Sequence, residues 1–138
     1  MQPAILEQSS ISVLRHIPSY ARWFIWGALT IFITAVSLAP SKTFEDVPSF
    51  SYEDLLVHFC LYFGYTASLL FALLPHHKDI KLTIITAAAF SIAYGIGIEI
   101  LQPIVQPNDR TFSILDILAN STGAVGISLY IFIHRHKD

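Results

Sequence analysis

The sequence has few charged residues and almost no cysteine. Only 13% of its 138 residues are Asp, Glu, Lys or Arg, and 54% are hydrophobic, whereas soluble domains carry about 25% charged residues. The single cysteine, Cys60, excludes an internal disulfide framework. It lies within an apolar stretch, where a thiol is expected to behave as a small apolar side chain. The composition is therefore typical of neither a disulfide-rich secreted domain nor an ordinary soluble one.

Several motifs of common catalytic sites are also absent. The sequence has no HExxH motif, no paired Cys or His at metal-ligand spacing and no glycine-rich phosphate loop. No serine lies in a G-x-S-x-G turn. We therefore expect no bound metal, no cofactor and no nucleic-acid partner, and we favour a non-enzymatic protein while keeping an enzyme as the alternative.

Four apolar stretches are long enough to cross a bilayer. They lie near residues 20–39, 54–74, 81–102 and 112–133, and about 20 apolar residues span the hydrocarbon core. A soluble protein with buried helices is the alternative, but short polar loops between four nearly continuous apolar runs favour the membrane. We predict an all-α membrane protein, an antiparallel bundle of four transmembrane helices. A cytoplasmic lead over residues 1–19 would precede one transmembrane domain over residues 20–138.

The distribution of Lys and Arg predicts the orientation of this bundle. Two cations, Lys42 and Arg110, lie in the first and third predicted loops. The other cations lie on the opposite side of the predicted spans, and they are Arg15, Arg22, Lys78, Lys81, Arg135 and Lys137. Because cytoplasmic loops carry an excess of Lys and Arg, both termini are expected in the cytoplasm.

Three of the apolar stretches each contain one ionisable residue near one end, namely His58, Glu99 and Asp116. An antiparallel bundle would bring all three to the extracytoplasmic side. Such groups are costly inside a membrane unless they are paired or hydrated, and they are usually functional. Gln102 and Asn120 follow at helical spacing on the same faces. The sequence therefore predicts a polar pocket that opens outward, with a purely structural network as the alternative.

The chemistry of this predicted pocket stays open. Two carboxylates and an imidazole can act as general acid and base or bind a divalent metal, but the sequence gives no stronger signal for either. Arg110 ends the loop between the third and fourth stretches. It could reach lipid headgroups as an interfacial side chain. Alternatively, it could neutralise Glu99 or Asp116 or receive an anionic ligand.

Two segments carry patterns that match a known family. Asp54, His58-Phe59 and Tyr62 fit a D-K-x-x-H-F-x-x-Y motif, with Leu55 at the position that is usually Lys. The pattern E-x-x-Q…R-x-x-x-x-x-D-x-x-x-N-x-x-G is matched by Glu99, Gln102, Arg110, Asp116, Asn120 and Gly123. On these motifs the sequence resembles the VanZ-like family from about residue 37 to its end. The first apolar stretch matches the family only in its general character and not in any motif.

The resemblance implies a bacterial integral protein of the cytoplasmic (inner) membrane. The family's namesake confers low-level resistance to the glycopeptide teicoplanin. The resemblance therefore implies a cellular location and a resistance phenotype, but it does not imply a particular chemical reaction. We expect an envelope protein that interacts with membrane lipid or a lipid-bearing ligand, such as a lipoglycopeptide or a cell-wall precursor.

The rival hypothesis is a membrane enzyme acting on a lipid-linked envelope substrate. His58 and Glu99 would then be its acid–base pair, with Asp116 beside them. The sequence leaves oligomerisation open.

Overall fold

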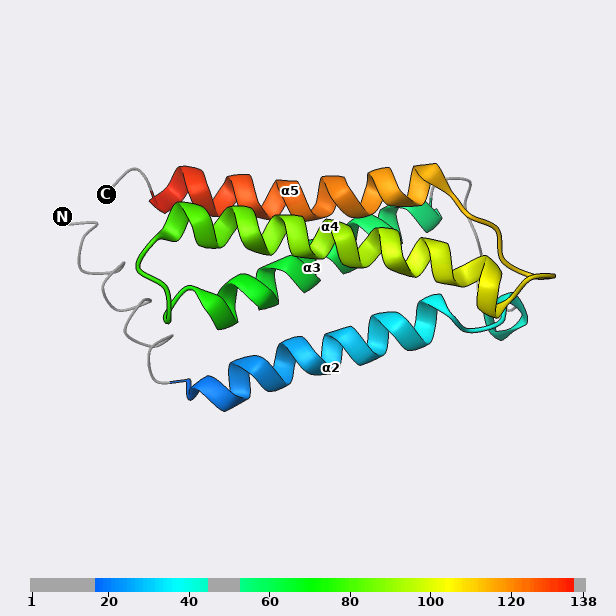
Figure 1. Cartoon of the computed structure of the whole chain (residues 1–138), viewed down its shortest axis with the longest axis horizontal. Coiled ribbons are helices and arrows are strands. Elements are labelled where there is room, and N and C mark those ends of the chain that lie inside the picture. The colour runs from blue at the N-terminus through cyan, green and yellow to red at the C-terminus, as the bar shows by residue number, and fades with distance from the viewer. Residues whose placement is uncertain (1–16, 45–52, 136–138) are drawn as a thin grey trace.

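The fold is a bundle of four helices lying side by side. A computed structural model describes residues 17–44 and 53–135 of the chain. The helices are α2 (Ser19–Ser37), α3 (Glu53–Leu73), α4 (Ile80–Val105) and α5 (Ile114–Arg135), with a short 3-10 helix, η1 (Ser41–Phe44), after α2. Successive helices run in opposite directions (Figure 1). The predicted all-α bundle is confirmed, and the part of the chain described here has no strand.

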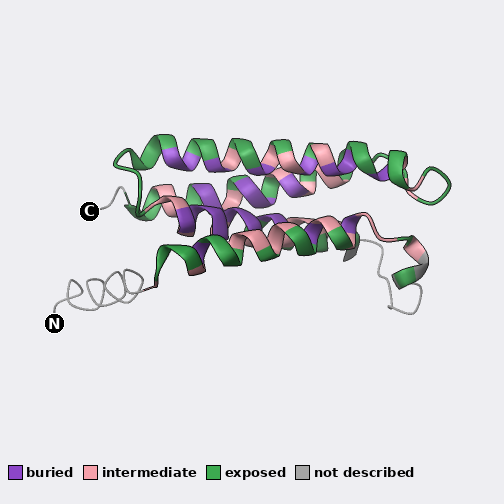
Figure 2. Ribbon diagram, turned by 60° about the horizontal axis from the view of Figure 1, so that its bottom comes forward, coloured by how far each residue is buried: buried purple, intermediate pink, exposed green. Residues whose placement is uncertain are grey.

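All four helices are long and apolar enough to cross a membrane. Large apolar side chains project outward from the bundle, including Phe24 and Ile31 of α2, which are 75% and 73% exposed. In Figure 2 the buried residues lie between the helices and the exposed ones lie on the outside. So much exposed apolar surface is unusual in water, but it is what the hydrocarbon interior of a bilayer solvates.

Helix α3 is the centre of the bundle. It packs against each of the other three helices, most extensively against α5, whereas α2 contacts α3 mainly and α4 only slightly. Gly123 of α5 allows the closest approach, because a Cβ there would collide with the backbone of Phe59 and Phe63 on α3. Small residues are the means by which helices pack closely in lipid. Gly123 is therefore a packing residue between α3 and α5.

A layer of tyrosines fills the middle of the bundle between α2, α3 and α4. Tyr62 and Tyr65 of α3 are almost fully buried, and Tyr65 stacks on Tyr94 of α4 with ring centroids 4.9 Å apart. The hydroxyl of Tyr94 forms a hydrogen bond with the hydroxyl of Thr34 on α2 at 2.7 Å. We call the end of the bundle that carries His58, Glu99 and Asp116 its polar end. The tyrosine layer lies between this polar end and the apolar core around Leu70.

The helix boundaries differ from the sequence prediction by one to three residues, and two of the differences have a local cause. Helix α4 continues through Pro103 to Val105, although the proline suggested an end at residue 102. Proline fits helical φ and removes only one backbone donor, so the last turn still closes with a bond from the Gln106 N–H to the Gln102 carbonyl at 2.8 Å. Helix α5 begins at Ile114 rather than near residue 112, because the Ser113 hydroxyl accepts a bond from the Asp116 N–H. Most of the predicted lead, residues 1–16, lies outside the described residues.

Candidate functional site

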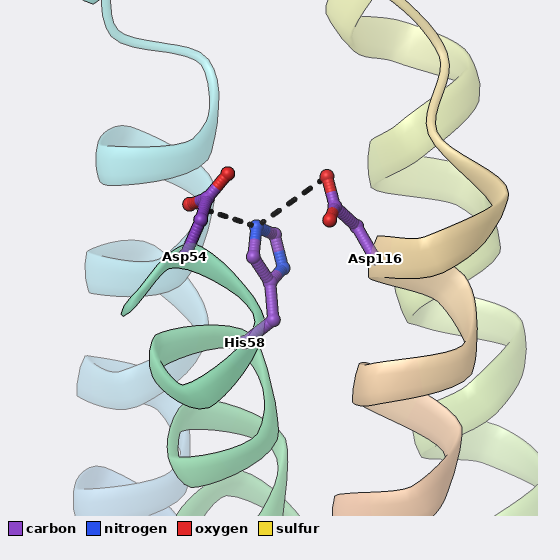
Figure 3. A group of neighbouring side chains, drawn as sticks. All are labelled: Asp54, His58 and Asp116. Carbon is purple, nitrogen blue, oxygen red and sulfur yellow. Dashed lines mark ion pairs between the residues drawn. The ribbon is translucent and has the colours of Figure 1, made fainter. Parts of the chain in front are cut away.

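Two aspartates and a histidine meet where α3 and α5 begin. Asp54 and His58 lie one turn apart on α3, so both point from the same helical face, and Asp116 lies in the first turn of α5. His58 Nε2 is 3.8 Å from Asp54 Oδ1 and 3.8 Å from Asp116 Oδ2. Figure 3 shows both carboxylates directed at the imidazole. We call these three residues the acidic–histidine cluster.

Access to this cluster changes with depth. The side chain of Asp54 is 78% exposed, whereas those of His58 and Asp116 are 13% and 15% exposed. Asp116 lies closer to the end of its helix than the sequence suggested, because α5 begins two residues later than expected. The cluster therefore extends from the surface of the bundle into its polar interior.

Asn120 forms a hydrogen bond with the imidazole of His58. It lies one turn after Asp116 on α5, is 1% exposed, and its Oδ1 is 3.0 Å from His58 Nδ1. An amide oxygen can only accept, so Nδ1 carries the proton and donates to it. His58 thus has a fixed orientation in which Nε2 faces the two carboxylates.

Glu99 is fully buried inside the bundle. Its side chain is 0% exposed, and neither carboxylate oxygen has a hydrogen-bond partner among the described residues. The backbone of Ser113 approaches the carboxylate without forming a hydrogen bond of good geometry. Its titratable neighbours are Asp116, His58 and Asp54, with which it interacts electrostatically. The prediction that Glu99 faces inward toward His58 and Asp116 agrees with this burial.

Gln102 and Arg110 lie apart from the acidic–histidine cluster. The side-chain amide of Gln102 donates to the Ser37 carbonyl at 3.1 Å, and Arg110 donates to the Ala39 carbonyl at 3.4 Å. Both side chains therefore contact the C-terminal end of α2. In the described part of the chain, Arg110 forms no ion pair with Glu99 or Asp116. Neutralisation of these carboxylates, one of the alternatives that the sequence left open, is therefore not seen, and the contacts with lipid headgroups or an anionic ligand stay predictions.

Sequence reasoning missed two residues of this region. Asp109, in the loop between α4 and α5, accepts hydrogen bonds from the backbone N–H and the hydroxyl of Ser41 at the start of η1. Gln106 donates to the Leu38 carbonyl at 3.4 Å. The Pro-Asn-Asp sequence indicated a turn here but not its partner, because the position of the α2 end is set by the tertiary structure.

The structure also has an open cavity of about 540 Å³ at the other end of the bundle. It lies between the start of α4 and the end of α5, and three cations line it together with Asp79, Ile80 and Phe132, namely Lys78, Lys81 and Arg135. The sequence predicted a pocket at the opposite end. The pocket at that end stays a prediction.

Comparison with known proteins identifies a family. The VanZ/LLP1 family model matches residues 17–134, nearly the whole chain. No curated protein and no solved structure matches the chain significantly. The matched segment contains the acidic–histidine cluster, Glu99 and all four candidate spans.

Proposed function

Since this chain belongs to the VanZ/LLP1 family and is a multi-pass membrane protein, we propose that it interacts with a lipid-bearing ligand at the outer face of the bacterial cytoplasmic membrane. Both termini would lie in the cytoplasm, as the distribution of Lys and Arg predicts. The physiological effect would be tolerance to an acylated glycopeptide such as teicoplanin.

The observation that carries this proposal is the gradient of exposure through the polar end. Asp54 is open to the surface, His58 and Asp116 are mostly covered, and Glu99 is sealed inside. A polar headgroup could enter from the surface along this gradient, because hydrogen-bonding groups continue inward from Asp54. No other described end of the bundle combines carboxylates with a histidine in this way.

Apolar surface beside the cluster supports a lipid-bearing ligand. Val57, three residues after Asp54 on the adjoining face of α3, is 46% exposed, and Leu115, next to Asp116 on α5, is 61% exposed. An acyl chain could pack against these side chains while its headgroup contacts the cluster. Burial of an acyl chain contributes about 0.8 kcal/mol per CH₂, so membrane residence would decide which ligands reach the site.

Teicoplanin carries an acyl chain and vancomycin does not, which gives a direct test. Expression of this protein in a susceptible Gram-positive host should raise the inhibitory concentration of teicoplanin more than that of vancomycin. Glu99→Gln and Arg110→Ala should remove the difference, whereas Asp79→Asn, at the opposite end of the bundle, should retain it. Membrane levels of each variant are measured by immunoblot. Equal tolerance to both drugs would contradict a role for the acyl chain.

A second candidate is a membrane enzyme acting on a lipid-linked envelope substrate. The observation that favours it is Glu99, a buried carboxylate without a hydrogen-bond partner beside a histidine. A carboxyl group and an imidazole can share proton transfer, with Asp116 and Asn120 orienting the ring. Time-dependent loss of a co-purified lipid in wild-type protein, but not in Glu99→Gln, would support the enzyme over the binding protein.

A further inference from the structure

We propose that Asp54, His58 and Asp116 bind one divalent transition-metal ion. This inference goes beyond the proposed ligand interaction, and it is tested on the purified protein whatever the outcome of the drug-tolerance experiment. The sequence left metal binding by His58, Glu99 and Asp116 open as one possibility, but it did not point to Asp54 as a ligand.

The three side chains offer donors at suitable separations. One nitrogen and two oxygens lie within 4.8 Å of one another, and Nε2 of His58 is 3.8 Å from an oxygen of each aspartate. Ligand atoms around a tetrahedral ion with bonds of ~2.1 Å are ~3.4 Å apart. Small side-chain rotations would therefore close the cluster on an ion, and the exposed Asp54 side chain is free to make the largest of them.

The orientation of His58 is the one that a metal ligand requires. Its Nδ1 donates to Asn120 Oδ1 at 3.0 Å, which leaves Nε2 directed at the space between the carboxylates. Histidines that bind metals usually donate their other N–H to an oxygen in this way, and the contact fixes both tautomer and ring orientation. Asn120 would thus be a positioning residue.

The charges around the cluster also favour a cation. Asp54, Asp116 and the buried Glu99 place three carboxyl groups near one imidazole, and neither oxygen of Glu99 has a hydrogen-bond partner among the described residues. Among the described residues, no Lys or Arg side chain forms an ion pair with these carboxylates. A divalent cation would supply the compensating positive charge at the centre of the group.

The donor set narrows the choice of metal. Imidazole nitrogen suits Zn²⁺ and other transition ions, and carboxylate oxygen also suits Mn²⁺. Three protein ligands leave coordination positions open, as in catalytic rather than structural zinc sites. Because Asp54 is exposed, these positions would be reached from the surface of the bundle by water or by an oxygen of an anionic ligand.

The experiment uses the full-length protein, purified in detergent without a polyhistidine tag and stripped of metal with a chelator. Titration with Zn²⁺ and with Mn²⁺, followed by calorimetry, should give saturable binding of one ion per chain. Asp54→Asn and Asp116→Asn should each weaken binding about tenfold or more, because each removes a charged ligand. Asp79→Asn, a matched aspartate change at the other end of the bundle, should bind like wild type.

Two further controls make the result decisive. His76 and His77 are exposed and could bind Zn²⁺ adventitiously, so the double variant His76→Gln/His77→Gln should retain the ion.

The side chain of Asp54 is 78% exposed, so Asp54→Asn should fold normally even if Asp116→Asn does not, and metal-free thermal melting checks this. Mn²⁺ bound to wild type should give an electron paramagnetic resonance signal that Asp54→Asn changes. No saturable binding, or loss of binding only in the His76/His77 variant, would overturn the proposal.

Discussion

Gln102 on α4 donates a hydrogen bond to the backbone carbonyl of Ser37, the last residue of α2, at 3.1 Å. One turn later, Gln106 makes a longer bond of 3.4 Å to the carbonyl of Leu38. The last carbonyls of a helix have no partner within the helix, so side chains from α4 satisfy those of α2. These bonds fasten α2 to α4 at the polar end, although the two helices pack only slightly against each other.

Gln102→Leu should destabilise the protein more than Gln106→Leu. Gln102 is 4% exposed and Ser37 is 9% exposed, so loss of the donor leaves a buried carbonyl unpaired, which costs about 1–3 kcal/mol. Gln106 is less buried and its bond is longer, so its replacement should cost much less. Thermal melting in detergent measures both variants. Equal destabilisation would show that the hydrogen bond to Ser37 contributes no more to stability than the hydrogen bond to Leu38.

Gly123→Ala should force α3 and α5 apart. The added Cβ would meet the Phe59 carbonyl and the Phe63 N–H, which belong to the backbone and cannot rotate away, and overpacking of this kind costs about 1–3 kcal/mol. Gly126→Ala is the matched control, because a Cβ at Gly126 meets nothing within 4 Å. Chemical-denaturant unfolding of both variants should show destabilisation only for the first. An unaltered Gly123→Ala protein would contradict the close helix contact.

Glu99→Gln should raise the stability of metal-free protein. The wild-type carboxyl group is fully buried without a hydrogen-bond partner and interacts with the carboxylates of Asp116 and Asp54, and an amide of the same shape removes the cost of ionising a group there. We expect a gain of about 1 kcal/mol, together with loss of drug tolerance. The melting temperature of chelator-treated protein measures this effect. A fall in melting temperature would mean that the Glu99 charge stabilises the fold through a contact with His58.

Both termini should lie in the cytoplasm. The excess of Lys and Arg near Lys78, Lys81 and Arg135 predicts this orientation by the positive-inside rule. A reporter active in the cytoplasm should work when it is fused after Lys137 or within residues 76–81, and one active outside the membrane should work within residues 43–50. The reverse pattern would place the acidic–histidine cluster on the cytoplasmic side and would remove the proposed outer ligand.

The helices and the meeting of His58 with Asp116 were predictable because both follow from local patterns. Apolar length identifies the spans, and alternation of direction brings the start of α3 beside the start of α5. Burial of Glu99 follows from its place on the same inward face as Gly95 and Gln102.

The contacts of Gln102, Arg110 and Asp109 were not predictable, because each depends on where the end of α2 lies in space. The position of Arg110 in the sequence predicts that it lies near the polar end of the bundle. It does not show whether the guanidinium contacts a carboxylate or a backbone carbonyl there. The helical turn across Pro103 was missed for a related reason. Proline lowers the probability of a helix, yet the surrounding contacts of α4 outweigh one lost hydrogen bond.

The single cysteine, Cys60, allows the depth of the protein in the bilayer to be measured. Cys60 is exposed on α3, two residues after His58, so it lies about 3 Å further along the helix axis. A fluorophore attached there would sit among lipid chains, and lipids with quenchers at known positions along their acyl chains would report its distance from the bilayer centre. The immersion of the acidic–histidine cluster can therefore be measured in the natural sequence, with no cysteine added or removed.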